Sequence, residues 1–316
     1  MCYHVGHMSE PIIADIGIIG AGPAGYSAAV YAARAGYSTV LWAGPEPGGQ
    51  LMTTNTVDNF LGFPEGIMGP ELMELCRKQT ERLGAKIIQD IVTAIEPVDG
   101  QFVLKADKQP GKVKAVIIAT GAVSKWLGTE SETKFRGKGI SACATCDGFF
   151  FKNKKVFVIG AGDVAMEDTN TLTQYAESVT VLVRGEESKM KASKIMYERA
   201  KNHPKVKFMF NTEVDEFLGD AMLKSVRVKN NVTGEKQELP VDGVFIAIGH
   251  KPNTEPFCKL VTCDEGGYIK TNGTATNVPG IFAAGDVADK VYRQAITSAG
   301  TGCMAALDAK KWLETK

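Results

Sequence analysis

Two cysteines three positions apart could carry redox chemistry. Cys143 and Cys146 lie in the stretch SACATCDGFF (141–150), and Asp147 follows the second cysteine at once. A C-x-x-C pair can cycle between a dithiol and a disulfide, and an adjacent carboxyl group can carry the proton that a leaving thiolate needs. The spacing therefore predicts a redox-active disulfide with an acid–base partner.

A zinc site and a pair of inert buried thiols are the alternatives for these two cysteines. A structural zinc site needs four ligands, and the rest of the sequence offers only Cys258 and Cys263 at short spacing, with four scattered histidines. No metal ligands are therefore expected. The cysteines outside the C-x-x-C pair are expected to be structural or incidental: Cys2, Cys76, Cys258, Cys263 and Cys303.

A glycine-rich turn near the N-terminus predicts a dinucleotide site. The strand-like run IIADIGII (12–19) leads into GAGPAG (20–25) and then into an alanine-rich helical stretch that ends at Ala35. In such a unit the first glycine permits the turn, the second lets a pyrophosphate approach, and the third allows close helix packing. The next strand (38–44) lacks the acidic residue expected to bind the ribose, and Glu46 is the nearest carboxylate.

The same pattern starts again in the middle of the chain. The strand KKVFVIG (154–160) leads into a turn with Gly160 and Gly162, a helix expected through about residue 176, and a strand at 179–183. Ala165 stands in the third glycine's place. Arg184 ends the second strand, where a guanidinium can pair with a 2′-phosphate, so the pattern favours NADPH over NADH.

Some charged residues near Arg184 favour binding of a 2′-phosphate, and others oppose it. Lys189 and Lys191 could add positive charge for a phosphate, whereas Glu186 and Glu187 oppose it and could instead accept from ribose hydroxyls. An exposed arginine at a strand end is the alternative for Arg184. Two βαβ units in one chain indicate an α/β fold with a resident flavin and an exchanging nicotinamide, for which the C-x-x-C would be the next electron acceptor.

Composition narrows the function classes. The chain has 316 residues, enough for two domains, and its 36 basic and 36 acidic residues balance. No run of one charge suggests a nucleic-acid or membrane-surface partner. The apolar runs are only strand-length, and the N-terminus lacks the pattern of a secretory signal. Seven cysteines, an odd number, favour a reducing compartment, so we expect a cytoplasmic protein.

Eight motifs in a fixed order resemble one family. GAGPAG, GGQLMTT, ATG, ACATCDG, GAGDVAME, AIGHKPNT, AAGD and YRQAITSAGTGCMAALDA extend along nearly the whole chain. Together they resemble the low-molecular-weight thioredoxin reductases, of the class II pyridine nucleotide-disulfide oxidoreductase family. The resemblance implies a homodimer of α/β chains with two Rossmann-like nucleotide-binding domains. The NAD(P)H domain (124–251), which carries the dithiol, would be inserted into the FAD domain (1–123 and 252–316).

The resemblance also implies the cofactor contacts. Pro23 and its neighbours would hold the FAD pyrophosphate, Val92 would lie near the adenine, Asp286 would bond the ribityl chain, and Gln50 and Asn59 would approach the flavin. The start of the last helix would line the isoalloxazine, where the helix dipole favours negative charge. The residues expected to bind a cofactor are Gly20, Gly22, Pro23, Ala24, Gln50, Asn59, Val92, Thr120, Gly121, Gly160, Gly162, Asp163, Arg184, Lys189, Lys191, Gly285, Asp286, Arg293, Gln294 and Ala295.

The implied reaction is the reduction of a thioredoxin disulfide. NADPH would reduce FAD, FAD would reduce the Cys143–Cys146 disulfide, and the dithiol would reduce oxidised thioredoxin. Cys146 would be the thiol next to the flavin, Cys143 the thiol that attacks the protein substrate, and Asp147 the acid–base group. Because one disulfide must serve both partners, the inserted domain is expected to rotate about linkers near 121–127 and 248–254.

One departure from the family leaves alternatives open. The family's 2′-phosphate motif has a histidine and two arginines followed by a third arginine, whereas here the positions are Val183, Arg184, Gly185 and Lys191. NADH therefore stays an alternative donor. A flavin dithiol oxidase and a ferredoxin-dependent thioredoxin reductase are alternative enzymes on the same scaffold. A nucleotide-binding redox sensor without turnover is the alternative outside the enzymes.

Overall fold

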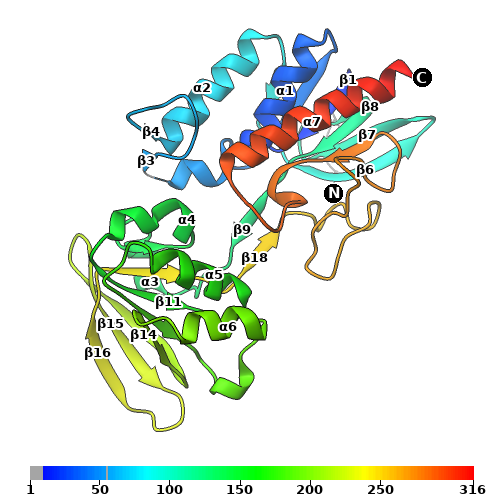
Figure 1. Ribbon diagram of the computed structural model, residues 1–316. Coiled ribbons are helices and arrows are strands. Elements are labelled where there is room, and N and C mark those ends of the chain that lie inside the picture. The colour runs from blue at the N-terminus through cyan, green and yellow to red at the C-terminus, as the bar shows by residue number, and fades with distance from the viewer. Residues whose placement is uncertain (1–9, 55) are drawn as a thin grey trace, which may run out of the picture. The chain divides into compact units, whose positions relative to one another are not determined.

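The chain forms two compact units. The computed structural model describes residues 10–54 and 56–316, so the expectation for Cys2 lies outside the described residues. The first unit runs to Val123 and resumes at Lys251, and the second unit comprises Ser124–His250 (Figure 1). Which cofactor each unit binds stays a prediction.

A seven-stranded sheet forms the centre of the first unit. Its order is β5-β2-β1-β8-β7-β6, with β19 also paired to β8. Strands β1, β2, β5, β8 and β19 are parallel, whereas β6 and β7 form an antiparallel hairpin that continues onto β8. The strands are β1 (Ile12–Ile19), β2 (Thr39–Trp42), β5 (Lys86–Ile88), β6 (Val92–Val98), β7 (Gln101–Ala106), β8 (Gly111–Ile118) and β19 (Ile281–Ala283).

Three helices cover one face of this sheet. They are α1 (Pro23–Arg34), α2 (Gly69–Arg82) and α7 (Ala295–Glu314). On β8, Ala115 and Ile117 pack toward the helices, whereas Val116 and Ile118 pack against the opposite face. This alternation is the period of two expected of a strand that is buried on both faces.

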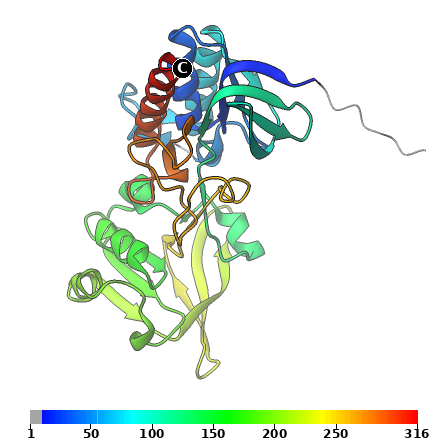
Figure 2. The ribbon, with the colours of Figure 1, turned by 90° about the vertical axis from the view of Figure 1, so that its right-hand side faces the viewer.

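Figure 2 shows α7 (red), from the end of the sequence, lying against α1 (blue), from near its beginning. The approach is close because Gly302 of α7 has no side chain. A Cβ atom there would come within 2.1 Å of the Ala24 carbonyl oxygen of α1. Two segments from opposite ends of the sequence are thereby fixed together.

Short elements complete the first unit and its connections to the second. They are η1 (Gly49–Thr53), β3 (Thr56–Val57), β4 (Ile67–Met68) and η4 (Gly285–Val287), and β9 (Ala122–Ser124) pairs with β18 (His250–Pro252) where the chain passes between the units. Beside these strands, the Asn253 N–H donates to the Gly121 carbonyl at 2.9 Å.

A five-stranded parallel sheet forms the centre of the second unit, in the order β10-β17-β11-β12-β13. An antiparallel sheet, β14-β15-β16, extends from it. The strands are β10 (Ile140–Ser141), β11 (Lys155–Ile159), β12 (Ser178–Leu182), β13 (Val206–Met209), β14 (Thr212–Gly219), β15 (Leu223–Asn230), β16 (Lys236–Pro240) and β17 (Gly243–Ile246). The helices are α3 (Glu130–Phe135), α4 (Ala144–Asp147), η2 (Gly148–Phe151), α5 (Asp163–Leu172), η3 (Glu187–Lys189) and α6 (Lys194–Lys201).

The predicted α/β fold class is confirmed, and two details differ. The helix expected through about residue 176 ends at Leu172, because the Tyr175 carbonyl accepts from the Asn153 N–H and the chain turns toward β12. The antiparallel sheet was not predicted. In β15 the buried Val226 and Val228 alternate with polar residues, so the strand has no continuous apolar run.

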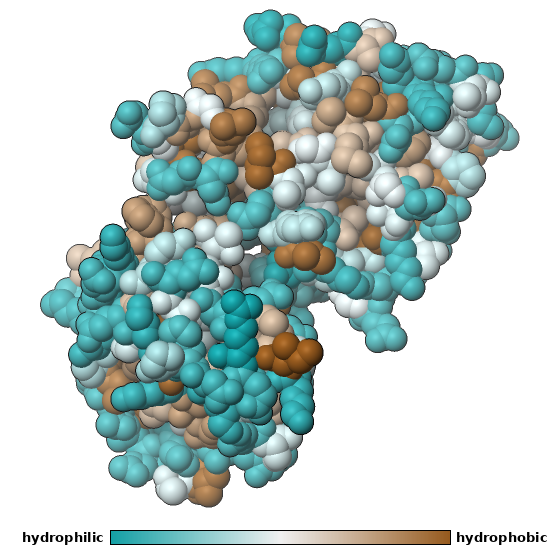
Figure 3. Space-filling model, viewed as in Figure 1, coloured by the Kyte–Doolittle hydropathy of each residue, from teal (hydrophilic) through white to brown (hydrophobic). Residues whose placement is uncertain are grey.

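The surface that Figure 3 presents is mostly hydrophilic, with hydrophobic side chains scattered over it. Scattered exposed apolar side chains are normal for a folded protein. Among residues 10–54 and 56–316, no helix combines the length and apolar character that a membrane span requires.

Candidate active site

The first glycine turn has the geometry that a nucleotide fingerprint requires. Gly20 has a φ of +106°, and a Cβ there would come within 2.3 Å of the Ala119 carbonyl oxygen. A Cβ on Gly25 would come within 1.8 Å of the Gly20 carbonyl oxygen. A Cβ on Gly22, in contrast, would meet no atom within 4 Å. Two glycines are thus needed by the protein itself, and the open space at Gly22 is where a phosphate group could approach.

Helix α1 begins directly after this open position. Gly22 is its N-cap residue and Pro23 stands in its first turn, where the missing N–H costs nothing. No side chain among the described residues caps the N-terminus of α1, and its first turn holds no acidic residue. The N–H groups of that turn are therefore available to an anion, as dinucleotide binding requires.

The predicted flavin-side residues Asn59 and Gln294 lie together despite a separation of 235 positions. Asn59 Nδ2 donates to Gln294 Oε1 at 3.2 Å. Gln294 is the N-cap of α7 and forms a capping box with Thr297, so α7 begins at Ala295. Gln50, on η1, has an exposed side chain.

Arg293 precedes this cap in a left-handed backbone conformation, with a φ of +48°. Asp289 supports the turn, because its carboxylate accepts the backbone N–H groups of Val291, Tyr292 and Arg293. The Arg293 guanidinium donates to the Lys290 carbonyl at 3.0 Å. This turn therefore fixes the backbone just before α7.

Asp286 lies on η4 beside the start of α7. The Ser298 hydroxyl donates to Asp286 Oδ1 at 2.9 Å. Burial raises the pKa of the Asp286 carboxyl to about 6, although the Ser298 hydrogen bond opposes the shift. The neighbouring Gly285 has a φ of +76°, and a Cβ there would come within 2.9 Å of Ala24 Cβ. Asp286 is therefore held near the first turn of α1.

Three other predicted residues have structural partners. Val92 is 4% exposed and packs in the core under the sheet, so only its backbone is available to a ligand. Thr120 Oγ1 donates to the Asn253 carbonyl at 2.7 Å, and Gly121 accepts the Asn253 N–H. Asn253, within the motif AIGHKPNT, was not singled out in the sequence. The roles of these residues toward a cofactor stay predictions.

The second glycine turn repeats the first with one substitution. A Cβ on Gly160 would come within 2.3 Å of the Ala247 carbonyl oxygen, whereas a Cβ on Gly162 would meet no atom within 4 Å. Ala165, in the third place, is fully buried. Asp163 Oδ1 accepts the Ser193 N–H at 2.7 Å, so this predicted cofactor residue also anchors the loop before α6.

The acidic residues near Arg184 have partners of their own. Glu187 accepts from the Tyr197 hydroxyl at 2.6 Å and pairs with Lys201, whose ammonium group is the main reason that its pKa is lowered. Glu186 Oε1 lies 3.4 Å from Lys189 Nζ. Within the described part of the chain, the exposed guanidinium of Arg184 forms no ion pair. Its charge is therefore available to a ligand.

The C-x-x-C pair is a disulfide. Cys143 and Cys146 are bonded, with their Cα atoms 5.3 Å apart, across the one-turn helix α4. Cys143 Sγ accepts the Cys146 N–H at 3.2 Å. Cys146 is exposed and Cys143 half-buried. An N–H that points at a sulfur stabilises its thiolate, so the helix turn favours negative charge on Cys143 once the bond is reduced.

Asp147 is mostly buried beside the disulfide. Burial raises the pKa of its carboxyl, and the hydroxyl of Ser141 acts in the opposite direction. Ser141 Oγ also accepts the Cys143 N–H at 3.1 Å. The sequence did not single out Ser141, although its place two residues before Cys143 in SACATCD was a signal that it could contact the pair.

Cys258 and Cys263 form a second disulfide in the first unit. The four sulfurs considered for zinc thus belong to two separate disulfides. Across the described ranges, no group of three or more histidine, cysteine or acidic residues is placed to hold a metal ion.

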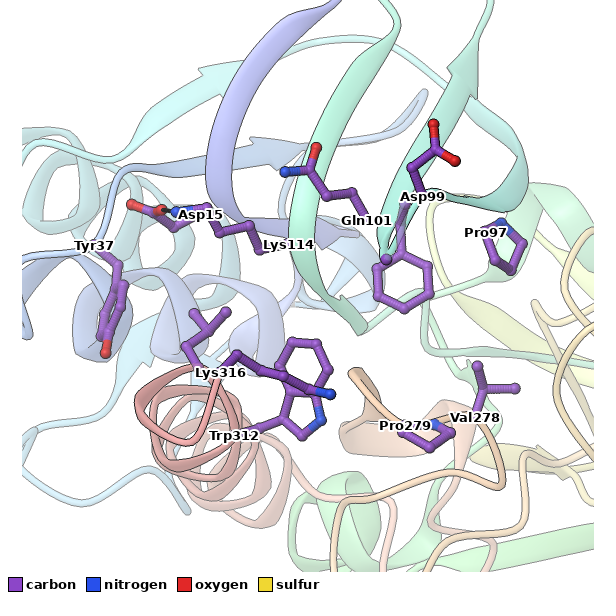
Figure 4. A pocket seen from close by; sticks show the side chains of 13 residues that line it. Asp15, Tyr37, Pro97, Asp99, Gln101, Lys114, Val278, Pro279, Trp312 and Lys316 are labelled. Carbon is purple, nitrogen blue, oxygen red and sulfur yellow. Dashed lines mark hydrogen bonds and ion pairs between the residues drawn. The ribbon is translucent and has the colours of Figure 1, made fainter.

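A cavity of about 660 Å³ lies elsewhere in the first unit (Figure 4). Asp15 and Lys114 line it and form an ion pair at 2.8 Å, and Trp312 borders it from α7. None of the residues predicted to bind a cofactor lines this cavity. The candidate functional residues of each unit, at the glycine turns and the dithiol, therefore lie outside this cavity.

Comparison with known proteins assigns the family. The model of the pyridine nucleotide-disulphide oxidoreductases matches residues 14–302. The chain belongs to this family. A pyridine nucleotide-disulphide oxidoreductase uses a flavin and a pyridine nucleotide, which the two glycine turns fit.

Individual relatives agree with the family. A thioredoxin reductase of Mycolicibacterium smegmatis is 46% identical over 301 residues, which cover 95% of this chain and 96% of that protein. A solved thioredoxin reductase from Streptococcus pyogenes MGAS5005 has a TM-score of 0.92 at 36% identity and covers 97% of this chain and 100% of that one. The resemblance predicted from the motifs is confirmed.

A relative with a different name is equally similar. A glucosaminate ammonia-lyase of Pseudomonas fluorescens is 49% identical over 306 residues, which cover 94% of this chain and 95% of that protein. Overall sequence identity therefore does not decide between a thioredoxin reductase and a glucosaminate ammonia-lyase. The chemistry of the site must decide between them.

Proposed function

We propose that this protein is a thioredoxin-disulfide reductase that uses FAD and NADPH. The observation that carries the proposal is the Cys143–Cys146 disulfide beside Asp147, whose carboxyl pKa is raised by partial burial. Disulfide exchange with a protein substrate needs a dithiol and a proton carrier, and these residues supply both. Elimination of ammonia would leave the dithiol without a role.

The two glycine turns would hold the cofactors. The open backbone at Gly22 and the uncapped start of α1 suit the FAD pyrophosphate, and Asp286 with the start of α7 suits the rest of the flavin. The turn at Gly162 and the exposed guanidinium of Arg184 suit NADPH. Bound together, the two cofactors supply the pair of electrons that reduces the Cys143–Cys146 disulfide.

The dithiol then acts on the substrate disulfide in two steps. The Cys143 thiolate, stabilised by the Cys146 N–H, attacks one sulfur of the substrate disulfide, which breaks the substrate S–S bond, forms a mixed disulfide and expels the other substrate sulfur as a thiolate. The Cys146 thiolate attacks Cys143, which releases the second substrate thiolate and restores the Cys143–Cys146 disulfide. Asp147, whose pKa is raised by burial, supplies a proton to the leaving thiolate.

The charge around Arg184 supports NADPH as the donor. Glu187, which could repel a 2′-phosphate, is paired with the Lys201 ammonium group and accepts a hydrogen bond from the Tyr197 hydroxyl. Arg184 and Lys191 then provide the positive charge for the phosphate. We further propose a homodimer in the cytoplasm, in which the first unit binds FAD and the second binds NADPH, and which takes thioredoxin as its protein partner.

The test is the initial rate of reduction of oxidised thioredoxin by the FAD-loaded protein, with NADPH and with NADH over a range of each. We expect turnover with NADPH at low concentration. Cys146→Ser should retain reduction of the flavin by NADPH and lose thioredoxin reduction. The same preparation is assayed for release of ammonia from glucosaminate, where we expect none.

Three outcomes would overturn the proposal. Thioredoxin reduction that survives in Cys146→Ser would remove the dithiol from the mechanism. Failure of both nicotinamides to reduce the flavin would favour the ferredoxin-dependent alternative, and rapid oxygen consumption with small dithiols would favour the dithiol oxidase.

A further inference from the structure

The Cys258–Cys263 disulfide closes a small loop on the surface of the first unit. Cys258 lies in a turn, is exposed, and is followed by Lys259; Cys263 is half-buried and forms a β-bridge with Ile269. The proposed reaction makes no use of this bond. We propose that Cys258–Cys263 is a second, reversible redox site, whose reductant is a dithiol.

The loop can accommodate the reduced state because each sulfur lies near an acceptor. Cys258 Sγ lies 3.9 Å from the Gly267 carbonyl oxygen, and Cys263 Sγ lies 3.9 Å from the Val261 carbonyl oxygen. A thiol can donate to these oxygens, whereas a disulfide sulfur has no proton to donate. Reduction therefore exchanges a covalent bond for two weak hydrogen bonds and leaves no thiol without a partner.

The loop is also anchored by contacts that do not involve the disulfide. Phe257 and Val261 are each only 2% exposed and pack into the core under the sheet. Thr254 Oγ1 donates to the Gly267 carbonyl at 2.6 Å. Because these contacts persist when the bond is broken, reduction is expected to loosen the loop without unfolding the unit.

Reduction of Cys258–Cys263 takes place in two exchange steps. A thiolate of the incoming dithiol attacks the exposed Cys258 sulfur, and the S–S bond breaks with Cys263 leaving as a thiolate that takes up a proton. The second thiol of the reagent attacks the mixed disulfide and releases Cys258, which takes up the second proton. Two electrons and two protons pass to Cys258 and Cys263, and the reagent becomes a disulfide. The ammonium group of Lys259 favours approach of the attacking thiolate.

The closed loop is connected to the segment that flanks Asp286. Asp264, next to Cys263, accepts the backbone N–H groups of Gly266 and Tyr268 and pairs with Lys290 at 2.8 Å. Lys290 in turn holds the Arg293 guanidinium through its carbonyl. The order of the loop thereby supports the turn before α7.

A second connection runs through the backbone on the other side of Asp286. The Ile269 N–H donates to the Val287 carbonyl at 3.0 Å, and Ile269 is the residue that Cys263 meets in the β-bridge. Reduction of Cys258–Cys263 is therefore expected to increase the mobility of residues 285–294 as well as of the loop itself.

The proposed reaction regenerates a reduced dithiol protein, and such a protein is a reductant of this class. Only the choice of this protein as the reductant rests on the proposed function. The test uses dithiothreitol, so that a failure of the redox site and a failure of the proposed function are distinguishable.

The first experiment counts thiols on the full-length, FAD-loaded Cys143→Ser/Cys146→Ser variant, which removes the other disulfide. The protein is equilibrated with reduced and oxidised dithiothreitol at a series of ratios, alkylated under native conditions and digested for mass spectrometry. We expect Cys258 and Cys263 to become labelled together, reversibly, while the flavin stays bound. Labelling at every ratio, or no labelling at a large excess of dithiothreitol, would overturn the proposal.

The second experiment tests the connection to the flavin-side segment. Amide hydrogen exchange is compared for the oxidised protein and Cys258→Ser/Cys263→Ser, with Cys76→Ser/Cys303→Ser as the matched control. We expect exchange in residues 285–294 to become about tenfold faster in the first double variant alone. Unchanged exchange there, with faster exchange only within 258–263, would overturn the connection and confine the effect to the loop.

Discussion

Ser298 Oγ donates to Asp286 Oδ1 at 2.9 Å, which joins the first turn of α7 to η4 across the predicted flavin site. Asp286 is mostly buried, and desolvation raises the pKa of its carboxyl from 3.8 to about 6. A single hydrogen bond thus does not offset the cost of burying the charge. The carboxyl is held in place for a ligand at the expense of the stability of the cofactor-free protein.

The pH dependence of stability should report this cost. Because the folded protein binds the Asp286 proton more tightly than the unfolded chain, the free energy of unfolding falls as pH rises from about 4 to about 6 and stays lower above that range. Asp286→Asn should remove this loss and stabilise the FAD-free protein at pH 7 by up to about 3 kcal/mol. Urea unfolding of both proteins from pH 4 to 8 measures the free energy of unfolding. If this free energy changes with pH in the same way in both proteins, the pH dependence does not come from Asp286.

Asp147→Asn should slow the dithiol step without affecting nicotinamide binding. Because the pKa of Asp147 is raised, its acid form persists to higher pH, and the rate of thioredoxin reduction should fall as pH rises through that pKa. In Asp147→Asn the rate should no longer fall with rising pH in this way, and kcat should be about 100-fold lower. Ser141→Ala serves as the comparison, because loss of the hydroxyl should move this fall in rate to higher pH. A full rate in Asp147→Asn would exclude it as the acid.

Two glycine variants should separate folding from cofactor binding. Gly22→Ala adds a Cβ where no protein atom lies within 4 Å, so the protein should fold normally and lose bound FAD. Gly25→Ala forces a Cβ against the Gly20 carbonyl and should destabilise the fold by about 3 kcal/mol or more. Flavin absorbance of the purified proteins and urea unfolding without FAD distinguish the two effects. Full FAD content in Gly22→Ala would place the pyrophosphate elsewhere.

Arg184→Ala should raise the KM for NADPH about 10- to 100-fold and leave that for NADH unchanged, since loss of a charge-assisted pair costs about 1.5–3 kcal/mol. Lys189→Ala is the matched control, because that ammonium group already pairs with Glu186 and should contribute less. Steady-state rates with both nicotinamides measure the ratio. An equal rise for NADPH and NADH would mean that Arg184 does not bind the 2′-phosphate.

The parts of the fold with a strong local pattern were predictable. The strand Ile12–Ile19 and the helix from Pro23 follow from a continuous apolar run, a glycine turn and an alanine-rich stretch. The strands of the antiparallel sheet were not predicted, although the alternation of Val226 and Val228 with polar residues is the period-two pattern of a strand with one buried face. The length of α5 was overestimated, because a backbone contact from Asn153, distant in sequence, ends it.

The same division holds for the candidate site. The sequence by itself determined the residue types and spacing that carry chemistry: the C-x-x-C with Asp147, the two glycine turns and Arg184. These are local patterns, fixed by backbone requirements within a few residues. Only the tertiary structure brought Asn59 to Gln294 and held Glu187 with Lys201. Such pairings depend on how distant segments pack, which no local pattern records.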